Sequence, residues 1–209
     1  MILHDTAQRA PLIGISRLRM GSDGNGVTTL VAFHGCPLRC RYCLNPQCHD
    51  AVKMWKTPEQ VMRVLKKDEL YFWATRGGVT FGGGEPLLYP QFIQSVLELG
   101  AKQWHITVET SLNVLQENLV CLLPYIDEYI VDVKDMDSFI YQKYTSMSNE
   151  QVRDNLNLLI AHGKKDHLLV RIPLIKGFND ANAQGRSIEK LSSMGLTRFD
   201  KFEYKQTKQ

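Results

Sequence analysis

The stretch 35-GCPLRCRYC-43 decides how the rest of this sequence is interpreted. Its cysteines, Cys36, Cys40 and Cys43, have the spacing C-x3-C-x2-C. Three thiolates at this spacing can bind one [4Fe–4S] cluster and leave its fourth iron free for a ligand from outside the protein. The cysteines alone leave open a structural zinc site that also uses Cys48, although an isolated cysteine is as readily a free thiol.

A strand is expected immediately before this loop. The run VTTLVAFH at 27–34 is rich in β-branched and aromatic residues and ends at Gly35, which places the cysteines at the carboxyl end of a strand. After the loop, 57-TPEQ-60 combines an N-cap threonine with a first-turn proline, so a helix is expected to run to about Asp68. The further strands are expected at 78–81, 105–109, 129–133, 168–173 and 201–204, and the further helices at about 90–99, 114–121, 149–162 and 181–194.

This alternation of strands and helices predicts an α/β fold. Its parallel sheet would be joined by crossover helices and would be partly closed into a barrel. The 209 residues, of which 44% are hydrophobic, suit one domain over residues 1–209. In such a sheet the functional loops gather at the carboxyl ends of the strands. The motifs described below all lie at such ends.

The composition argues against several classes of function. The 25 basic and 22 acidic residues are interleaved rather than gathered in blocks, which gives little support to nucleic-acid binding. No segment approaches 18 uncharged apolar residues and the N-terminus lacks a signal-peptide pattern, so we expect no membrane association and a cytoplasmic location. Five cysteines, an odd number, suit a reduced metal-binding loop better than a disulfide framework. Cys121, in the apolar run NLVCLLPY, is expected in the core.

A glycine loop and several charged residues mark other strand ends. The segment 80-TFGGGEPLL-88 carries three consecutive glycines, which allow a close backbone approach that a Cβ would obstruct. By pattern alone, GGGEP is equally typical of a strand-to-helix turn. Charged residues also end the segments 108-VET-110 and 131-VDVK-134, where solvated side chains are the ordinary interpretation.

Taken in order, these segments resemble one family. The string SDGNGVTTLVAFHGCPLRCRYCLNPQ at 22–47 closely resembles the N-terminal signature of the glycyl radical enzyme activating enzymes, which belong to the radical S-adenosylmethionine (SAM) superfamily. TFGGGEPLL, VET, VDVK, RIPLIKGFND at 171–180 and FEYK at 202–205 follow in the family's order. The resemblance spans most of the chain and implies a partial (β/α)6 barrel of the radical SAM type. The chain lacks the ferredoxin-like cysteine insert of many members, so it is similar to a minimal form.

The resemblance also implies a reaction. Flavodoxin or ferredoxin would donate one electron to a [4Fe–4S] cluster on Cys36, Cys40 and Cys43. SAM bound to the open iron would then be cleaved to methionine and a 5′-deoxyadenosyl radical. That radical would abstract hydrogen from a glycine Cα of a partner glycyl radical enzyme.

The resemblance further assigns roles to individual residues. Those implied to contact SAM are Tyr42, Gly83, Gly84, Glu85, Lys134, Arg171 and Lys205. Those implied to give oxygen ligands to a monovalent cation, Na⁺ or K⁺, are Glu109, Thr110, Ile130 and Asp132. Asp23 matches a family position near the substrate peptide.

Two other functions remain open. A radical SAM enzyme of the same architecture could act on a small molecule or a peptide instead of a partner enzyme. A non-catalytic iron–sulfur or zinc module would use only the cysteine loop and would leave the GGGEP and VDVK motifs unexplained. Formation of 5′-deoxyadenosine separates the enzymes from the module, and a glycyl radical on a partner separates the two enzymes.

Overall fold

The carboxyl ends of parallel strands carry the motifs found in the sequence, as the computed structural model shows for residues 9–21 and 23–204. Lys205, expected to contact SAM, lies outside these described residues. The chain divides into two compact units. The first contains the described residues of Met1–Cys36, Asn45–Thr110 and Glu117–Tyr129, and the second those of Pro37–Leu44, Ser111–Gln116 and Ile130–Gln209.

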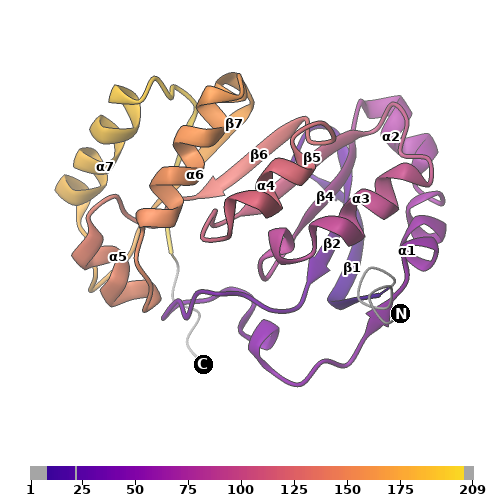
Figure 1. The fold of residues 1–209 in the computed structure, drawn as a ribbon, viewed down its shortest axis with the longest axis horizontal. Helices are drawn as coiled ribbons and strands as arrows, with labels where there is room; N and C mark the ends of the chain where they lie inside the picture. Colours follow the sequence, from indigo (N-terminus) through magenta and orange to yellow (C-terminus); the bar gives the residue numbers. More distant parts are fainter. Residues whose placement is uncertain (1–8, 22, 205–209) are drawn as a thin grey trace. The chain divides into compact units, whose positions relative to one another are not determined.

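The first unit is built on a mixed sheet with the strand order β3-β1-β2-β4-β5. Its strands are β1 (Ala10–Met20), β2 (Val27–Phe33), β3 (Trp55–Lys56), β4 (Gly78–Gly83) and β5 (His105–Thr110). β1 pairs antiparallel with both β2 and β3, whereas β2, β4 and β5 run parallel. Figure 1 shows these strands side by side, with α3 in front of them. The helical segments of this part of the chain are η1 (Pro46–His49), α1 (Pro58–Leu65), α2 (Glu69–Thr75), η2 (Pro86–Leu88), α3 (Pro90–Glu98) and α4 (Gln116–Leu122).

The second unit repeats the strand and helix alternation. β6 (Glu128–Asp132) ends in it, and β7 (Leu168–Leu174) pairs parallel with β8 (Phe199–Glu203). Its helical segments are α5 (Ser138–Thr145), α6 (Glu150–Ala161), η3 (Lys165–His167) and α7 (Ala181–Ser193). The short helix α5 begins at Asp137, whose carboxylate accepts hydrogen bonds from the amides of Phe139 and Ile140.

A cluster of aromatic rings in the first unit fixes the strands that carry the motifs. The ring of Phe33, at the end of β2, is fully buried and stacks on Tyr89 with the centroids 5.4 Å apart. Phe81 of β4 and Phe92 of α3 pack on it at 6.2 and 6.0 Å. Buried aromatic side chains of this size dominate core energetics, so the ends of β2 and β4 are held by the best-packed part of the unit.

The expected strands and helices form near the predicted residues, and the structure adds elements that the sequence analysis did not predict. The helix that begins at Thr57 has the predicted N-cap: its hydroxyl accepts from the amide of Gln60 at 3.3 Å, while the Gln60 side chain accepts from the Thr57 amide at 3.1 Å. This helix ends at Leu65 and not near Asp68. The strands and α-helices that were not predicted are β3, α2, α5 and β1, the last an eleven-residue strand before the segment 27–34 that was expected to be the first strand.

Asp68 lies between α1 and α2 and binds the two neighbouring strands β1 and β2. Its carboxylate is fully buried, accepts hydrogen bonds from Arg17 of β1 and accepts another from the Thr29 hydroxyl of β2 at 2.7 Å. These partners fix Asp68 in the turn between α1 and α2, because a buried carboxylate is costly unless it is paired. The Arg17 partner holds the pKa of Asp68 below its usual value, although burial acts to raise it.

Two expectations about the whole chain are not settled by the fold. Within the described residues, no helix has the length and apolar character that crossing a bilayer requires. The cytoplasmic location and the single domain over residues 1–209 stay predictions.

The pair His105–Glu128 in the first unit predicts a pH dependence of stability. The Glu128 carboxylate lies 3.6 Å from His105 Nε2 and raises the pKa of this histidine. A raised folded-state pKa stabilises the fold below the unfolded-state value of about 6.5, and this stabilisation is lost as the pH rises through the folded-state pKa. We expect the melting temperature of His105→Gln to fall below that of the wild type at about pH 6, with a smaller gap at about pH 9. Exposed His162→Gln should show no such narrowing, and parallel melting curves for both variants would contradict the assignment.

Candidate functional site

The glycine loop lies against the strand that leads into the cysteines. β2 and β4 pair parallel up to Phe33 and Gly83, so their carboxyl ends are adjacent. Beyond the ladder, the amide of Gly84 donates to Phe33 O at 2.8 Å and the amide of Glu85 donates to Gly35 O at 2.7 Å. These two hydrogen bonds fasten the GGGEP loop to the residue that precedes Cys36. The sequence prediction that both motifs lie at carboxyl strand ends is confirmed.

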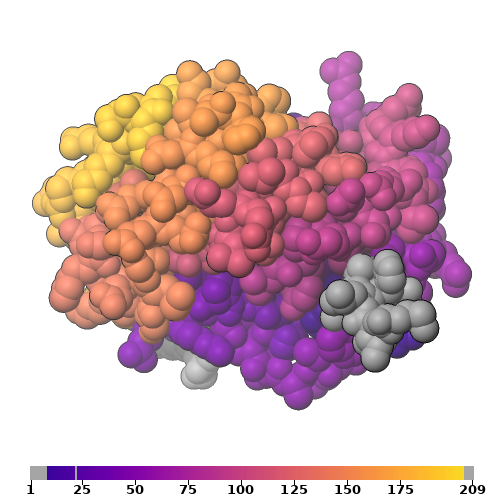
Figure 2. Space-filling model, viewed as in Figure 1, coloured from indigo at the N-terminus to yellow at the C-terminus, as the bar shows by residue number. Residues whose placement is uncertain are grey.

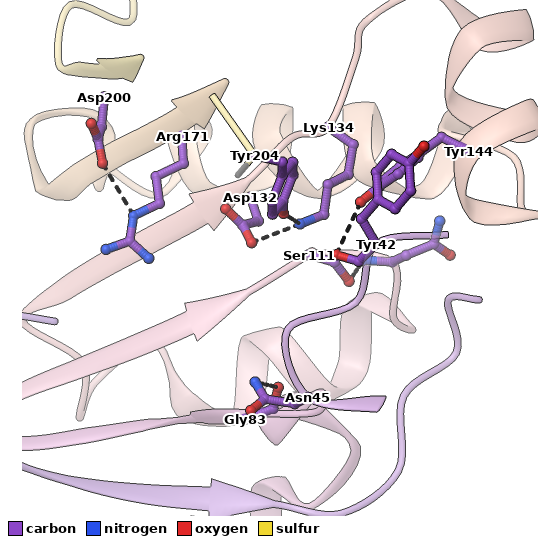
Figure 3. Close-up of polar contacts among 11 residues, drawn as sticks. Tyr42, Asn45, Gly83, Ser111, Asp132, Lys134, Tyr144, Arg171, Asp200 and Tyr204 are labelled. Carbon is purple, nitrogen blue, oxygen red and sulfur yellow. Dashed lines mark hydrogen bonds and ion pairs between the residues drawn. The ribbon is translucent and has the colours of Figure 1, made fainter. Parts of the chain in front are cut away.

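Glycine is sterically required at two positions of this loop. A Cβ at Gly84 would lie 2.1 Å from the backbone oxygen of Gly35, and one at Gly83 would lie 2.8 Å from Ala32 Cα. Gly83 also has a φ of +96°, which side-chain-bearing residues rarely adopt. The Gly83 carbonyl accepts from the amide side chain of Asn45 at 2.9 Å, so the segment after the cysteines also contacts the loop (Figure 3).

Glu85 is fully buried and already has partners. One carboxylate oxygen, Oε1, accepts from the Thr110 hydroxyl at 2.7 Å and from the Leu87 amide at 3.2 Å. The structure therefore brings together Glu85, expected to contact SAM, and Thr110, expected to bind a cation. The Glu109 side chain lies against the first glycine of the loop, because a Cβ added to Gly82 would be 3.3 Å from Glu109 Oε2.

Asp23, expected near a substrate peptide, is buried in the first unit. Only 3% of it is exposed, and both carboxylate oxygens lie 2.8 Å from Nε of Arg19. Its backbone oxygen accepts a hydrogen bond from the hydroxyl of Thr80 on β4. The structure thus shows Asp23 fixing the loop after β1 onto the sheet, and a contact with substrate stays a prediction.

In the second unit, a buried lysine lies between an aspartate and a tyrosine (Figure 3). Lys134 is 6% exposed, and its ammonium group donates to Asp132 Oδ2 at 2.7 Å and to the Tyr204 hydroxyl at 3.0 Å. Lys134 has a φ of +56°, a left-handed conformation that costs about 1–2 kcal/mol in a residue with a Cβ.

The electrostatics of this group favour a charged lysine. Burial acts to lower the pKa of Lys134, but Asp132, Tyr204 and Cys40 act together to raise it well above the usual value. Asp132 Oδ1 is buried and has no hydrogen-bond partner among the described residues. An unpartnered buried carboxylate oxygen is costly, so this atom is a fitting acceptor for an ammonium group or a small cation.

A hydrogen-bond network behind Lys134 joins the turns that follow β6 and β7. Asp135, 1% exposed, accepts from Ser187 Oγ at 3.0 Å and from Asn179 Nδ2 at 3.0 Å. Asn179 also accepts from the Ile175 amide at 2.5 Å and donates to Pro173 O at 3.1 Å. Sequence reasoning missed the roles of Asp135 and Asn179. Their only signal was their position inside or next to motifs quoted for other residues.

The cysteine loop packs on aromatic side chains of the second unit. Cys40 and Tyr42 contact a core cluster formed by Tyr144, Ile175 and Tyr204. The ring of Tyr42 meets Phe178 edge to face, with the centroids 5.9 Å apart. Burial raises the pKa of the Cys40 thiol, and nearby Lys134 acts against this increase. A metal centre bound here would displace a proton from Cys40.

The five cysteines differ in exposure. Cys36, Cys40 and Cys43 are free thiols and half-buried, and Cys48 in η1 is 1% exposed. Cys121 is half-buried on α4 and donates to Gln94 at 3.4 Å, so the expectation that it lies in the core was wrong. No group of three or more His, Cys, Asp or Glu side chains among residues 9–21 and 23–204 forms a ready ion site. Cys36 belongs to the first unit, whereas Cys40 and Cys43 belong to the second.

Arg171 lies in the middle of β7 and not at its end, where the sequence placed it. Its guanidinium pairs with Asp200 on β8, with Nε 3.3 Å from Oδ2 (Figure 3). Its backbone oxygen accepts from the Val133 amide at 3.1 Å, which places it beside the VDVK segment. Ile130 is buried in β6, and its expected role as a backbone ligand stays a prediction.

The fold and these strand ends define a class: an α/β protein that carries a cysteine loop and a glycine loop at adjacent strand ends. The Radical SAM superfamily model matches residues 30–184. The chain belongs to this superfamily, and its fold is the superfamily's partial (β/α)6 barrel, as predicted. The family implies a [4Fe–4S] cluster and SAM as its cofactors.

Curated relatives are activating enzymes. The (2S)-3-sulfopropanediol dehydratase activating enzyme of Klebsiella oxytoca is 36% identical, over 76% of this chain and 69% of the relative. The isethionate sulfite-lyase activating enzyme of Nitratidesulfovibrio vulgaris is 26% identical, over 81% of this chain and 76% of the relative. The 4-hydroxyphenylacetate decarboxylase activating enzyme of Clostridium scatologenes is 29% identical, over 77% and 72%.

Solved structures support the fold alone. SuiB of Streptococcus suis bound to SAM has a TM-score of 0.66 at 16% identity. The match covers 85% of this chain but 42% of SuiB, so the chain spans less than half of that protein. The enzyme anSMEcpe with bound SAM has a TM-score of 0.60, also at 16% identity, over 83% of this chain and 51% of that protein.

The residues present fit the two implied cofactors. Cys36, Cys40 and Cys43 are free thiols, and thiolates are the usual ligands of iron–sulfur clusters. The unpartnered buried oxygen of Asp132 suits a positively charged group.

Gly84→Ala tests the steric requirement in the glycine loop. The added methyl group would lie 2.1 Å from the Gly35 oxygen, so the two strand ends must separate. Overpacking of this kind typically costs about 1–3 kcal/mol, and urea denaturation should show that decrease in the free energy of unfolding. Gly185→Ala is the control because nothing lies within 4 Å of its Cβ in α7, and there alanine should be neutral or stabilising. Equal effects at both sites would contradict the steric argument.

Tyr204→Phe tests the buried lysine. The change removes a hydroxyl that accepts from the Lys134 ammonium group, so a buried charge loses a hydrogen bond. Hydrogen bonds to charged groups contribute about 1.5–3 kcal/mol, and we expect a loss of that order in urea unfolding. Tyr71→Phe, at a half-exposed tyrosine of α2, serves as the control and should change stability little. No loss in Tyr204→Phe would mean that water replaces the hydroxyl.

Proposed function

We propose that this chain activates a glycyl radical enzyme, using a [4Fe–4S] cluster on Cys36, Cys40 and Cys43. The observation that carries the proposal is the pairing of this cysteine loop with the glycine loop at adjacent strand ends. The activating-enzyme names of relatives up to 36% identical support the choice of substrate. A flavodoxin or ferredoxin is the proposed electron donor.

Cluster and SAM together supply the radical chemistry, in which one electron cleaves SAM to methionine and a 5′-deoxyadenosyl radical. The residues of the chain would bind the two cofactors and orient SAM. Gly83, Gly84 and Glu85 would contact SAM, as the family's matching positions imply. The Tyr42 ring, half-buried against Phe178, would pack on the adenine.

Lys134 and Asp132 have proposed roles in binding charged groups. Lys134, held charged by Asp132 and Tyr204, would attract the SAM carboxylate. Asp132, through its unpartnered oxygen, would share a monovalent cation with Glu109, Thr110 and the backbone of Ile130. Arg171 would border the nucleoside and Lys205 would contact SAM, as the family's matching positions imply. Asp23 would lie near the glycine-bearing peptide.

Cys40→Ala tests the cofactor part of the proposal. The protein is reconstituted anaerobically with iron and sulfide, reduced with dithionite in the presence of SAM, and analysed by chromatography for 5′-deoxyadenosine. Wild type should form it, and Cys40→Ala should lose at least about 100-fold in rate, as expected when a ligand of the cofactor is removed. Cys48→Ala is the matched control, because Cys48 is buried and is proposed to be no ligand.

Each outcome of this test has a meaning. Loss of iron in Cys48→Ala would overturn the three-cysteine site. A wild-type protein that binds four irons and forms no deoxyadenosine would be a non-catalytic iron–sulfur module. When a candidate glycyl radical enzyme is added, a doublet in electron paramagnetic resonance is expected on that partner. Deoxyadenosine without a radical on any such partner would instead indicate a small-molecule or peptide substrate.

A further inference from the structure

Three segments of the second unit carry positive charge and no acidic residue. The stretch 37–44 (PLRCRYCL) contains Arg39 and Arg41, α5 contains Lys143, and the turn 175–178 (IKGF) contains Lys176. In the whole chain the 25 basic residues are nearly matched by 22 acidic ones. A run of three neighbouring segments without a carboxylate therefore departs from the pattern of the rest of the chain.

Backbone hydrogen bonds and one contact between a lysine and an aromatic ring bring the three segments together. The amides of Arg39 and Arg41 donate to Thr145 O at 2.9 Å and to Tyr144 O at 3.2 Å, so the cysteine loop lies along the end of α5. The ammonium group of Lys143 lies 5.8 Å from the centre of the Phe178 ring in the third segment. Figure 1 shows the violet loop segment beside the end of α5. We call Arg39, Arg41, Lys143 and Lys176 the basic surface.

All four side chains of the basic surface are exposed. None of them forms a hydrogen bond or ion pair with the described residues, whereas Arg17, Arg19 and Arg171 each bind a carboxylate. Like charges gathered without a counter-charge repel one another, so this arrangement does not stabilise the isolated fold. It does attract an acidic partner.

Two large apolar side chains accompany the charges. Phe139 is 73% exposed and precedes Lys143 by four residues on α5, so both lie on one helix face. Leu44, directly after the cysteine loop, is 74% exposed. Figure 2 shows atoms of α5 at the surface, at the lower left. An apolar centre with a charged rim is typical of protein interfaces, and transient redox complexes have small interfaces.

We propose that the basic surface docks an acidic electron-carrier protein of the flavodoxin type. The proposal rests on the function proposed above. Arg39 and Arg41 alternate with the cysteines, so a donor held there approaches the cluster ligands themselves. One electron leaves the reduced flavin, which is oxidised by one electron, and the cluster bound to the cysteines accepts it. Complementary charge accelerates such encounters and makes them sensitive to salt.

The variant Gln142→Glu/Lys143→Glu, called the α5 variant below, reverses charge at the basic surface. Lys102→Glu/Gln103→Glu is a matched control, because it makes the same two changes at exposed neighbours in the turn before β5. Binding of labelled flavodoxin to each reconstituted full-length protein is measured by fluorescence anisotropy at two salt concentrations, about 50 and 300 mM. The Debye length is about 14 Å at the lower concentration and about 6 Å at the higher one. At low salt we expect the dissociation constant to rise by about tenfold in the α5 variant and little in the control. High salt should narrow the difference.

A kinetic readout accompanies the binding measurement. With flavodoxin as reductant, deoxyadenosine formation by the α5 variant should slow by about tenfold at a limiting flavodoxin concentration. With dithionite it should be unchanged. Acidic residues near the end of α5 oppose the helix dipole, so Lys143→Gln is included as a variant that adds no negative charge. Melting curves check that each variant is folded.

The outcomes separate the two proposals. Equal flavodoxin affinity in the α5 variant and the control would overturn the docking surface. A slower dithionite reaction in the α5 variant alone would also overturn it, because the residues would then act within the active site. The α5 variant could also form less glycyl radical with dithionite while it forms deoxyadenosine at the normal rate. That result would assign the basic surface to the glycyl radical partner and would refute its role in docking the electron donor. If wild type forms no deoxyadenosine with either reductant, the proposed function fails, and the binding data still decide the surface.

Discussion

The parallel pairing of β2 with β4 is the constraint on which the candidate site depends. The ladder ends at Phe33 and Gly83, and two further hydrogen bonds carry the contact onto Gly84 and Glu85. Because a Cβ at Gly84 has no space, these strand ends approach more closely than ordinary side chains allow. The aromatic packing around Phe33 holds them in that position, so the core and the site are stabilised by the same contacts.

Much of the fold could be predicted from local patterns. Val27–Phe33 is β-branched and aromatic, and Thr57-Pro58 with Gln60 is an N-cap that forms as expected. β1 could not be predicted in this way, because Pro11 and Gly14 interrupt its pattern. Its position depends on pairing with β2 and on the Arg17–Asp68 pair, whose members are 51 residues apart. Tertiary contacts of this kind override local propensity.

The candidate site divides in the same manner. The cysteine spacing and the glycine run are contiguous in the chain, so the sequence alone located them. The geometry around Lys134 could not be predicted from the sequence, because its partner Tyr204 is 70 residues away and no local pattern indicates the left-handed backbone of Lys134. Nor could spacing indicate that Asp23 is covered by Arg19, or that Arg171 faces Asp200. A sequence motif identifies a candidate residue, whereas the tertiary structure determines which side chains that residue contacts.

The link between Asp135 and Asn179 makes the turns after β6 and β7 a single mechanical element. The Ile175 amide hydrogen is held by the Asn179 side chain, whose own amide group is held by Asp135. That hydrogen can exchange with solvent only after it separates from the Asn179 side chain, so its exchange rate reports the opening of the turn after β7. Because Asp135 holds the same side chain from the turn after β6, loss of the Asp135 carboxylate should make this hydrogen exchange faster.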